Sequence, residues 1–146
     1  MLKNISPLLT PSLLFGLSKM GHGDWVAVVD ANFPAHRLTQ AAGAELIELP
    51  GHSTSLVLEA ILSVFPLDTF EVPCAQTMQV VGDEKAVPLP VSEFRSIFKQ
   101  HGESEPNTLE RFAFYSLASS ARVIVQTGDL RKYANIVLRK GVISID

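Results

Sequence analysis

Short apolar or alternating runs recur along the chain, and segments that contain proline and glycine separate them. Runs of this length that are rich in valine and isoleucine predict strands rather than helices. We therefore expect strands over residues 25–29, 44–49, 77–81, 122–127 and 136–138.

Apolar residues at intervals of three and four predict helices between these strands. The first helix begins at Thr10, a residue type that favours the N-cap, and Gly21 is expected to close it in the left-handed conformation. Ser53 or Thr54 is predicted to begin a second helix. Further helices are expected over residues 91–100 and 110–119, and residues 40–43 are expected to form a connection.

Predicted strands and helices alternate along all 146 residues, and no change of composition marks a second domain. A chain of this length matches one ordinary domain with a sizeable core. Alternating strands and helices are typical of a parallel sheet that is covered on both faces. We predict a single three-layer α/β domain over residues 1–146, with a mostly parallel central sheet and helices on both faces.

Hydrophobic residues make up 47% of the chain, and the mean hydropathy is +0.23, which is apolar for a small domain. This surplus predicts a subunit interface, and hence a homo-oligomer. The formal net charge of −3 does not favour nucleic acid as a partner. No apolar run approaches the length of a membrane span, so a membrane partner is not expected either.

Cys74 is the only cysteine, which excludes an internal disulfide and a cysteine metal cluster. This cysteine usage fits a reducing compartment, and residues 1–7 lack the long apolar core of a secretory signal. We therefore expect a cytoplasmic location. Cys74 follows Pro73 and has no basic residue nearby in the sequence, which favours an inert thiol.

A histidine and a carboxylate flank the first predicted strand. His22 lies in a Gly-His-Gly sequence before the strand, and Asp30 ends it. Histidine titrates near neutral pH and a carboxylate can orient an imidazole, so the two suit proton transfer. Two plainer roles remain open, because His22 can cap carbonyls at a helix end and Asp30 can cap a turn with Ala31 and Asn32.

A second polar cluster follows the strand predicted over residues 122–127. Tyr133 and Asn135 bring a phenol and an amide close to a turn at residues 128–129. Such groups make the uncharged hydrogen bonds that sugar hydroxyls need. A purely structural turn that Asn135 caps is the alternative.

Other kinds of site have weaker support. The glycines that flank His22 precede a strand, whereas nucleotide-binding glycine loops follow one. His22, Asp30 and His36 are metal-ligand types, but no pair of them has helical ligand spacing. The sequence contains no nucleophile elbow for serine catalysis.

Several motifs in the same order carry a family resemblance. They are Gly-His-Gly-Asp at residues 21–24, Asp-Ala-Asn-Phe-Pro-Ala-His at 30–36, Arg-Phe-Ala-Phe-Tyr at 111–115, Thr-Gly at 127–128 and Tyr-Ala-Asn-Ile at 133–136. Together with segments 1–9 and 138–142, they resemble the sugar mutarotases that comprise L-fucose mutarotase and D-ribose pyranase. The motifs at 30–36 and 111–115 point to the fucose branch.

The resemblance implies interconversion of the α and β anomers of a free monosaccharide, with L-fucose as the expected substrate and no metal or organic cofactor. It implies that His22 is the catalytic residue and that Asp30, Arg111, Tyr133 and Asn135 bind the sugar. Asp30 would hold a sugar hydroxyl or fix the tautomer of His22, and Tyr133 is an alternative participant in proton transfer. The family also implies ring-shaped homo-oligomers, often decamers of two stacked pentamers, with sites at subunit boundaries.

Two functional alternatives remain. D-ribose pyranase chemistry shares the ring-opening step, and a non-catalytic sugar-binding protein would keep the same fold. Two positions depart from the family pattern, since Asn32 replaces a frequent histidine and Ala134 lies where glycine is common. The second departure matters only if the backbone at residue 134 has a positive φ angle.

Overall fold

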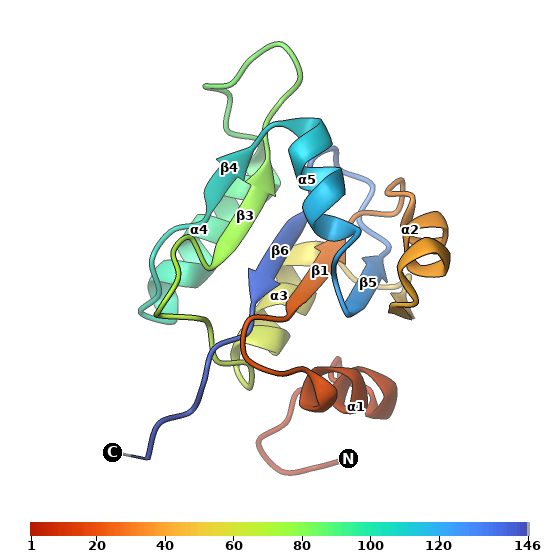
Figure 1. The fold of residues 1–146 in the computed structure, drawn as a ribbon, viewed down its shortest axis with the longest axis vertical. Coiled ribbons are helices and arrows are strands. Elements are labelled where there is room, and N and C mark those ends of the chain that lie inside the picture. Colours follow the sequence, from red (N-terminus) through yellow and green to blue (C-terminus); the bar gives the residue numbers. More distant parts are fainter. Residues whose placement is uncertain (146) are drawn as a thin grey trace.

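The computed structural model describes residues 1–145 and contains a six-stranded sheet with helices on both faces (Figure 1). The strands are β1 (Trp25–Val29), β2 (Glu45–Leu49), β3 (Ala75–Met78), β4 (Asn107–Leu109), β5 (Val123–Thr127) and β6 (Ile136–Arg139). The helices are α1 (Pro11–Lys19), α2 (Ala35–Ala42), α3 (Thr54–Leu62), α4 (Leu89–Gln100) and α5 (Arg111–Ala118). None of the helices in residues 1–145 is long and apolar enough to cross a membrane.

The strand order in the sheet is β2-β5-β1-β6-β3-β4. β5 pairs parallel with β1 and β2, and β3 pairs parallel with β4, whereas β6 is antiparallel to its neighbours β1 and β3. The prediction of a mostly parallel sheet is therefore confirmed, with β6 as the antiparallel strand. Because parallel strands end at the same edge, the segments that follow β1, β3 and β5 and the segment that precedes β6 converge there.

Each face of the sheet has its own apolar core. On one face, Val26 and Val28 of β1 pack in a cluster with residues of α1, α3 and α4, including the fully buried Phe94. On the other face, Ala27 of β1 packs with Phe114 of α5 and residues of α2. Figure 1 shows α5 in front of the sheet and α3 and α4 behind it. Successive residues of β1 point to opposite faces because a strand has a two-residue period. Helix residues pack on both faces, which confirms the prediction of helices on both faces.

The structure differs from the predicted elements at α2, β3 and β4. Residues 40–42, expected in a connection, end α2, a short helix that has few apolar residues and buries only Ala35 and Thr39. β3 ends at Met78, because the chain turns between Val80 and Asp83 instead of continuing to residue 81. β4 was not predicted, since three residues are too few to show an alternating pattern.

The prediction that Gly21 closes α1 in the left-handed conformation is wrong. α1 ends at Lys19, and its C-cap residue Met20 has extended backbone angles of φ −69° and ψ 138°. The left-handed residue is Gly23, with φ +84°, and its N–H donates to the carbonyl of Lys140 at 2.8 Å. The turn that leads into β1 is therefore placed by this contact with the end of β6 and not by the end of the helix.

Truncation of a core ring should show how strongly the α3 and α4 face holds the fold together. Phe94 is fully buried, so Phe94→Ala leaves a cavity and is expected to lower the free energy of unfolding by about 3–5 kcal/mol. Urea denaturation measures this loss. Phe15→Ala on α1, where the side chain is 60% exposed, is the control and should cost about 0.5 kcal/mol or less. Equal losses in the two variants would contradict this description of the core.

Candidate active site

Four sequence-predicted site residues meet at the edge of the sheet where β1, β3 and β5 end. Asp30 follows β1, Arg111 begins α5, and Tyr133 and Asn135 precede β6. The four side chains line one cavity of about 180 Å³. Sites for drug-sized ligands have volumes of about 300–1,000 Å³, so this smaller cavity suits a molecule the size of a monosaccharide.

Asp30 and Asn135 form a reciprocal pair of hydrogen bonds at the base of the cavity. The Asp30 backbone N–H donates to Asn135 Oδ1 at 2.8 Å, and Asn135 Nδ2 donates to Asp30 Oδ2 at 2.7 Å. Asp30 Oδ1 also accepts the N–H of Asn32 at 2.9 Å, so Asp30 does cap the turn as one prediction had it. Burial raises the pKa of Asp30 above its usual range, although the bonds from Asn135 and Asn32 oppose this shift.

Tyr133 has the left-handed backbone conformation, with φ 63°. A positive φ in a residue with a large side chain is a strained conformation that is found mainly at functional sites. The Tyr133 hydroxyl accepts the N–H of Val81 at 3.2 Å, and its own proton remains available to a ligand. Ala134 is outside the left-handed region, so its departure from the family pattern costs the backbone nothing.

Sequence reasoning missed an apolar wall of the same cavity. Phe33 and Tyr115 stack with ring centroids 5.3 Å apart, and Met78 and Val81 line the cavity beside them. Phe33 and Tyr115 lie inside two of the motifs that carry the family resemblance, whereas Met78 gave no signal. Arg111 lines the cavity and is exposed, and within residues 1–145 it makes no ion pair, while its guanidinium lies 4.7 Å from the ring centre of Phe112.

A charged network fixes the loop between β5 and β6. Asp129 Oδ2 accepts the N–H of Thr54 at 3.1 Å and lies 2.9 Å from Arg131 Nη2, while Arg131 Nη1 reaches Glu93 at 2.7 Å. Burial disfavours the charge on Asp129, but the bonds from Arg131 and Thr54 outweigh it and leave the pKa of Asp129 below its usual range. The loop that carries Tyr133 is thus tied to the beginning of α3 and to α4.

His22 does not join the other predicted site residues within one chain. It precedes β1, whereas Asp30 follows it, and at about 3.3 Å per residue the strand alone separates them by about 13 Å. The prediction that Asp30 fixes the His22 tautomer is therefore wrong for residues of the same chain.

The carboxylate beside His22 is that of Asp68. His22 Nε2 lies 3.1 Å from Asp68 Oδ1, which also accepts the N–H of Phe70 at 2.9 Å. The Phe70 N–H, and then His22 and Arg139, hold the pKa of Asp68 below its usual range despite its burial. The Phe70 ring approaches the imidazole edge-on, with centroids 5.6 Å apart. His22 thus pairs with a buried carboxylate rather than with the carbonyls of α1.

The weaker candidates from the sequence gain no support. His36 lies on α2, where it is exposed and pairs with Glu48 at 3.1 Å. Among residues 1–145, no three histidine, cysteine, aspartate or glutamate side chains gather as metal ligands. Cys74 is buried and its burial raises the pKa of the thiol, in line with the prediction that it is inert.

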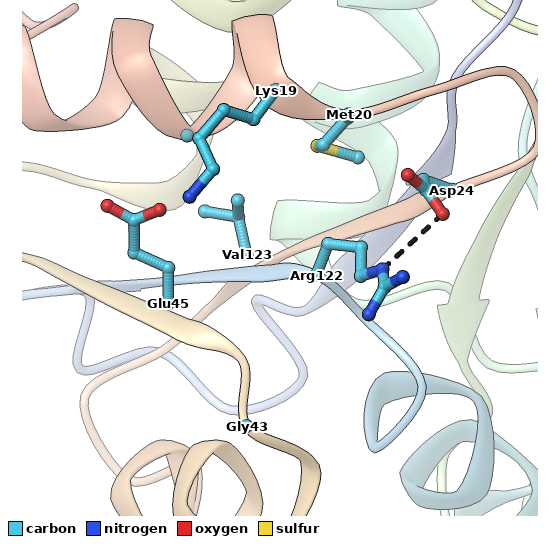
Figure 2. A pocket seen from close by; sticks show the side chains of 8 residues that line it. Lys19, Met20, Asp24, Gly43, Glu45, Arg122 and Val123 are labelled. Atoms are coloured by element: carbon cyan, nitrogen blue, oxygen red, sulfur yellow. Dashed lines mark ion pairs between the residues drawn. The ribbon is translucent and has the colours of Figure 1, made fainter.

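A second hollow, of about 270 Å³, lies at the opposite edge of the sheet and is lined by Lys19, Asp24, Glu45 and Arg122 (Figure 2). Arg122 Nε pairs with Asp24 Oδ1 at 3.6 Å, and Figure 2 shows Lys19 and Glu45 pointing toward one another. None of the predicted sugar-binding residues lines this hollow, whereas four of them line the other cavity. We assign the candidate site to the cavity around Asp30 and Asn135.

Comparisons with known proteins agree with the fold described above. Residues 3–143 match the RbsD / FucU transport protein family. The chain is 38% identical over 149 residues to fucose mutarotase of Homo sapiens, with 99% of this chain and 96% of that protein covered. It is 41% identical over 144 residues to L-fucose mutarotase of Glaesserella parasuis serovar 5, with 97% and 96% covered. The crystal structure of fucose mutarotase in complex with L-fucose from Streptococcus pneumoniae has a TM-score of 0.89 and 34% identity, with 98% of this chain and all of that chain (100%) covered.

Removal of the Asn135 amide should raise the pKa of Asp30 further. The hydrogen bond from Asn135 Nδ2 stabilises the ionised Asp30 carboxylate and so opposes the rise in pKa that burial causes. Asn135→Ala removes this bond. Because the folded pKa is already raised, the stability linked to Asp30 is present at low pH and is lost as the pH rises through that pKa. In Asn135→Ala the loss should occur at higher pH. A ¹³C NMR titration of the carboxyl group measures the shift.

The control for this titration is Asn107→Ala at the beginning of β4, where the side chain is exposed. It removes an amide without touching Asp30 and should leave the titration unchanged. An Asp30 titration in Asn135→Ala that matches the wild-type curve would show that the reciprocal pair does not control this carboxylate.

Proposed function

Because this chain belongs to the RbsD / FucU transport protein family, we propose that it is an isomerase that interconverts the α and β anomers of L-fucose. The observation that carries the proposal is the cavity in which Asp30, Arg111, Tyr133 and Asn135 meet, in a chain whose relatives over nearly the full length are fucose mutarotases. The reaction opens the sugar ring and closes it on the other face of the carbonyl group. The proposed chemistry uses no metal and no organic cofactor.

Ring opening requires one proton to leave the anomeric hydroxyl and one proton to reach the ring oxygen, while the bond between the anomeric carbon and the ring oxygen breaks. A single imidazole can accept the first proton and donate the second, and closure reverses both steps. We assign this role to His22. Positioned acid–base catalysis contributes about 10²–10⁴-fold, which is sufficient for a reaction that already proceeds slowly in water.

The cavity residues can hold the sugar by complementary contacts. Asp30 and Asn135 offer acceptors and donors for hydroxyl groups, and Arg111 offers a planar set of donors for two adjacent hydroxyls. The Tyr133 hydroxyl accepts from Val81 and so has its proton free to donate to the sugar, or to share in proton transfer. The Phe33 and Tyr115 rings provide an apolar wall for the methyl group and the C–H faces of a 6-deoxy sugar.

This chemistry needs two copies of the chain. His22 must approach the reacting atoms to within about 2.6–3.2 Å, yet β1 separates it from the cavity of its own chain. Both halves are flanked by exposed apolar side chains, with Phe70 beside His22 at 71% exposure and Phe112 beside Arg111 at 68%. We place His22 of one subunit over the cavity of its neighbour, in a ring-shaped homo-oligomer that we expect to be a decamer. The single cysteine supports a cytoplasmic location for it.

Replacement of His22 should abolish the acceleration of anomer exchange. NMR exchange spectroscopy of L-fucose measures the rate at which α and β anomers interconvert, with D-ribose as the comparison substrate. His22→Ala is expected to lose the enzymatic rate by about 10²–10⁴-fold. His36→Ala replaces an exposed histidine that pairs with Glu48, and it should keep full activity. Wild-type exchange rates in a folded His22→Ala protein would refute the assignment.

Mixing two inactive variants should restore activity if each site combines two subunits. His22→Ala lacks the proton-transfer group and Asp30→Asn lacks the carboxylate of the cavity. In a random mixed assembly, about one quarter of the boundaries join an intact His22 to an intact Asp30, so about a quarter of the wild-type rate is expected. The same exchange measurement detects it. If both residues acted within one chain, the mixture would remain as inactive as its parts.

A further inference from the structure

An arginine lies directly behind the carboxylate that pairs with His22. Arg139 Nε is 3.3 Å from Asp68 Oδ2, and within residues 1–145 neither of these buried atoms has a hydrogen-bond partner. The Asp68 backbone N–H also donates to the carbonyl of Arg139 at 3.1 Å. The two residues therefore face one another through both their side chains and their backbones, and His22, Asp68 and Arg139 form a continuous row.

The guanidinium of Arg139 is held from several sides. It lies 5.8 Å from the ring centre of Trp25, the residue opposite it in the pairing of β1 with β6. Its Nη1 pairs with Glu71. It also lies against the backbone of Gly23, where an added Cβ atom would come within 3.4 Å of Nη2. These contacts and a side chain that is only 21% exposed restrict the orientation of Arg139 toward Asp68.

The state of Asp68 determines which imidazole nitrogen carries the proton. The Phe70 N–H, His22 and Arg139 keep the pKa of Asp68 below its usual range, so the carboxylate is ionised at neutral pH. An ionised carboxylate only accepts hydrogen bonds, so His22 Nε2, 3.1 Å from Oδ1, must be the protonated nitrogen. The other nitrogen, Nδ1, is then the acceptor in neutral His22.

We propose that Arg139 is a positioning residue for the reaction, which holds the Asp68 carboxylate against His22 so that the imidazole keeps a proton on Nε2 and exchanges protons with the sugar through Nδ1. This inference rests on the proposed function. During ring opening, Nδ1 takes the proton of the anomeric hydroxyl as the carbonyl group forms. The imidazolium then returns that proton to the ring oxygen, whose bond to the anomeric carbon has broken, so that no proton is gained or lost overall.

The tautomer of His22 is the direct test. In protein labelled with ¹⁵N at histidine, the shifts of the two ring nitrogens distinguish an Nε2–H from an Nδ1–H imidazole. The chain has 4 histidines, so His22→Gln identifies the signals that belong to His22. We expect the Nε2–H form in the wild-type protein. A neutral His22 found mainly in the Nδ1–H form would overturn the proposal.

Arg139→Met should weaken this preference and slow the reaction. Without the guanidinium, Asp68 is no longer held in place, so both tautomers are expected in the spectrum. We expect kcat for L-fucose exchange to fall about tenfold, as for other residues that orient a histidine through its partner. KM should change by less than about twofold, since in the proposed arrangement Arg139 acts on His22 through Asp68 and not on the sugar. Arg139→Lys retains the charge and should recover part of kcat.

Arg122→Met is the matched control, because Arg122 lies at the same edge of the sheet, pairs with Asp24 at 3.6 Å and is 68% exposed. It should leave the tautomer and kcat unchanged.

Arg139→Gln, which keeps an amide donor, replaces Arg139→Met if the latter does not fold, and the same losses are expected. Wild-type kcat and an unchanged tautomer in a folded Arg139 variant would overturn the proposal. If wild-type protein fails to accelerate L-fucose exchange, the proposed function fails, while the tautomer measurement still decides the role of Arg139 separately.

Discussion

The extended backbone of β1 sets a fixed distance between the two halves of the candidate site. The strand is paired along its length with β5 on one side and β6 on the other, and its central residues are fully buried, so it cannot shorten or bend. His22 and Asp30 therefore remain at opposite edges of the sheet in every copy of the chain. If the proposed chemistry is correct, assembly is a condition for activity, and the exposed apolar side chains at both edges have a catalytic as well as a structural purpose.

The two edges of the sheet each hold a buried carboxylate, and their surroundings shift its pKa in opposite directions. Burial dominates at Asp30 and raises its pKa, whereas the Phe70 N–H, followed by His22 and Arg139, dominates at Asp68 and lowers its pKa. Asp30 is held by an amide and faces a cavity suited to neutral hydroxyl groups. Asp68 is held by a guanidinium and supports an imidazole. Each half of the site thus has the charge balance that its proposed task requires, binding in one case and proton transfer in the other.

Local sequence patterns predicted the elements whose burial is periodic and missed those whose contacts are distant. The valine-rich run gave β1 with its observed boundaries, whereas α2 was missed because it is only 8 residues long and buries only Ala35 and Thr39. Asp68 was missed because its partner His22 is 46 positions away, and no local pattern joins the two. The sequence pattern instead suggested a pair between His22 and Asp30, which are close in the sequence but lie beyond opposite ends of the extended strand β1. Arg111 came from the family resemblance alone, since a lone arginine at the beginning of a helix carries no specific signal.

The hydrogen bond between Val81 and Tyr133 uses the main chain of Val81 and not its side chain. Every amino acid except proline supplies the same donor, so the bond does not depend on which residue occupies position 81. The loop from β3 to α4, which projects beyond the sheet in Figure 1, can therefore change its side chains over evolutionary time while Tyr133 keeps its place. Since Val81 also lines the cavity, substitutions there can reshape the wall around a ligand without disturbing the hydroxyl that would bind it. If the proposed function holds, divergence toward other sugars can begin in this loop, because the exposed Val81 side chain lines the cavity while its main chain holds Tyr133.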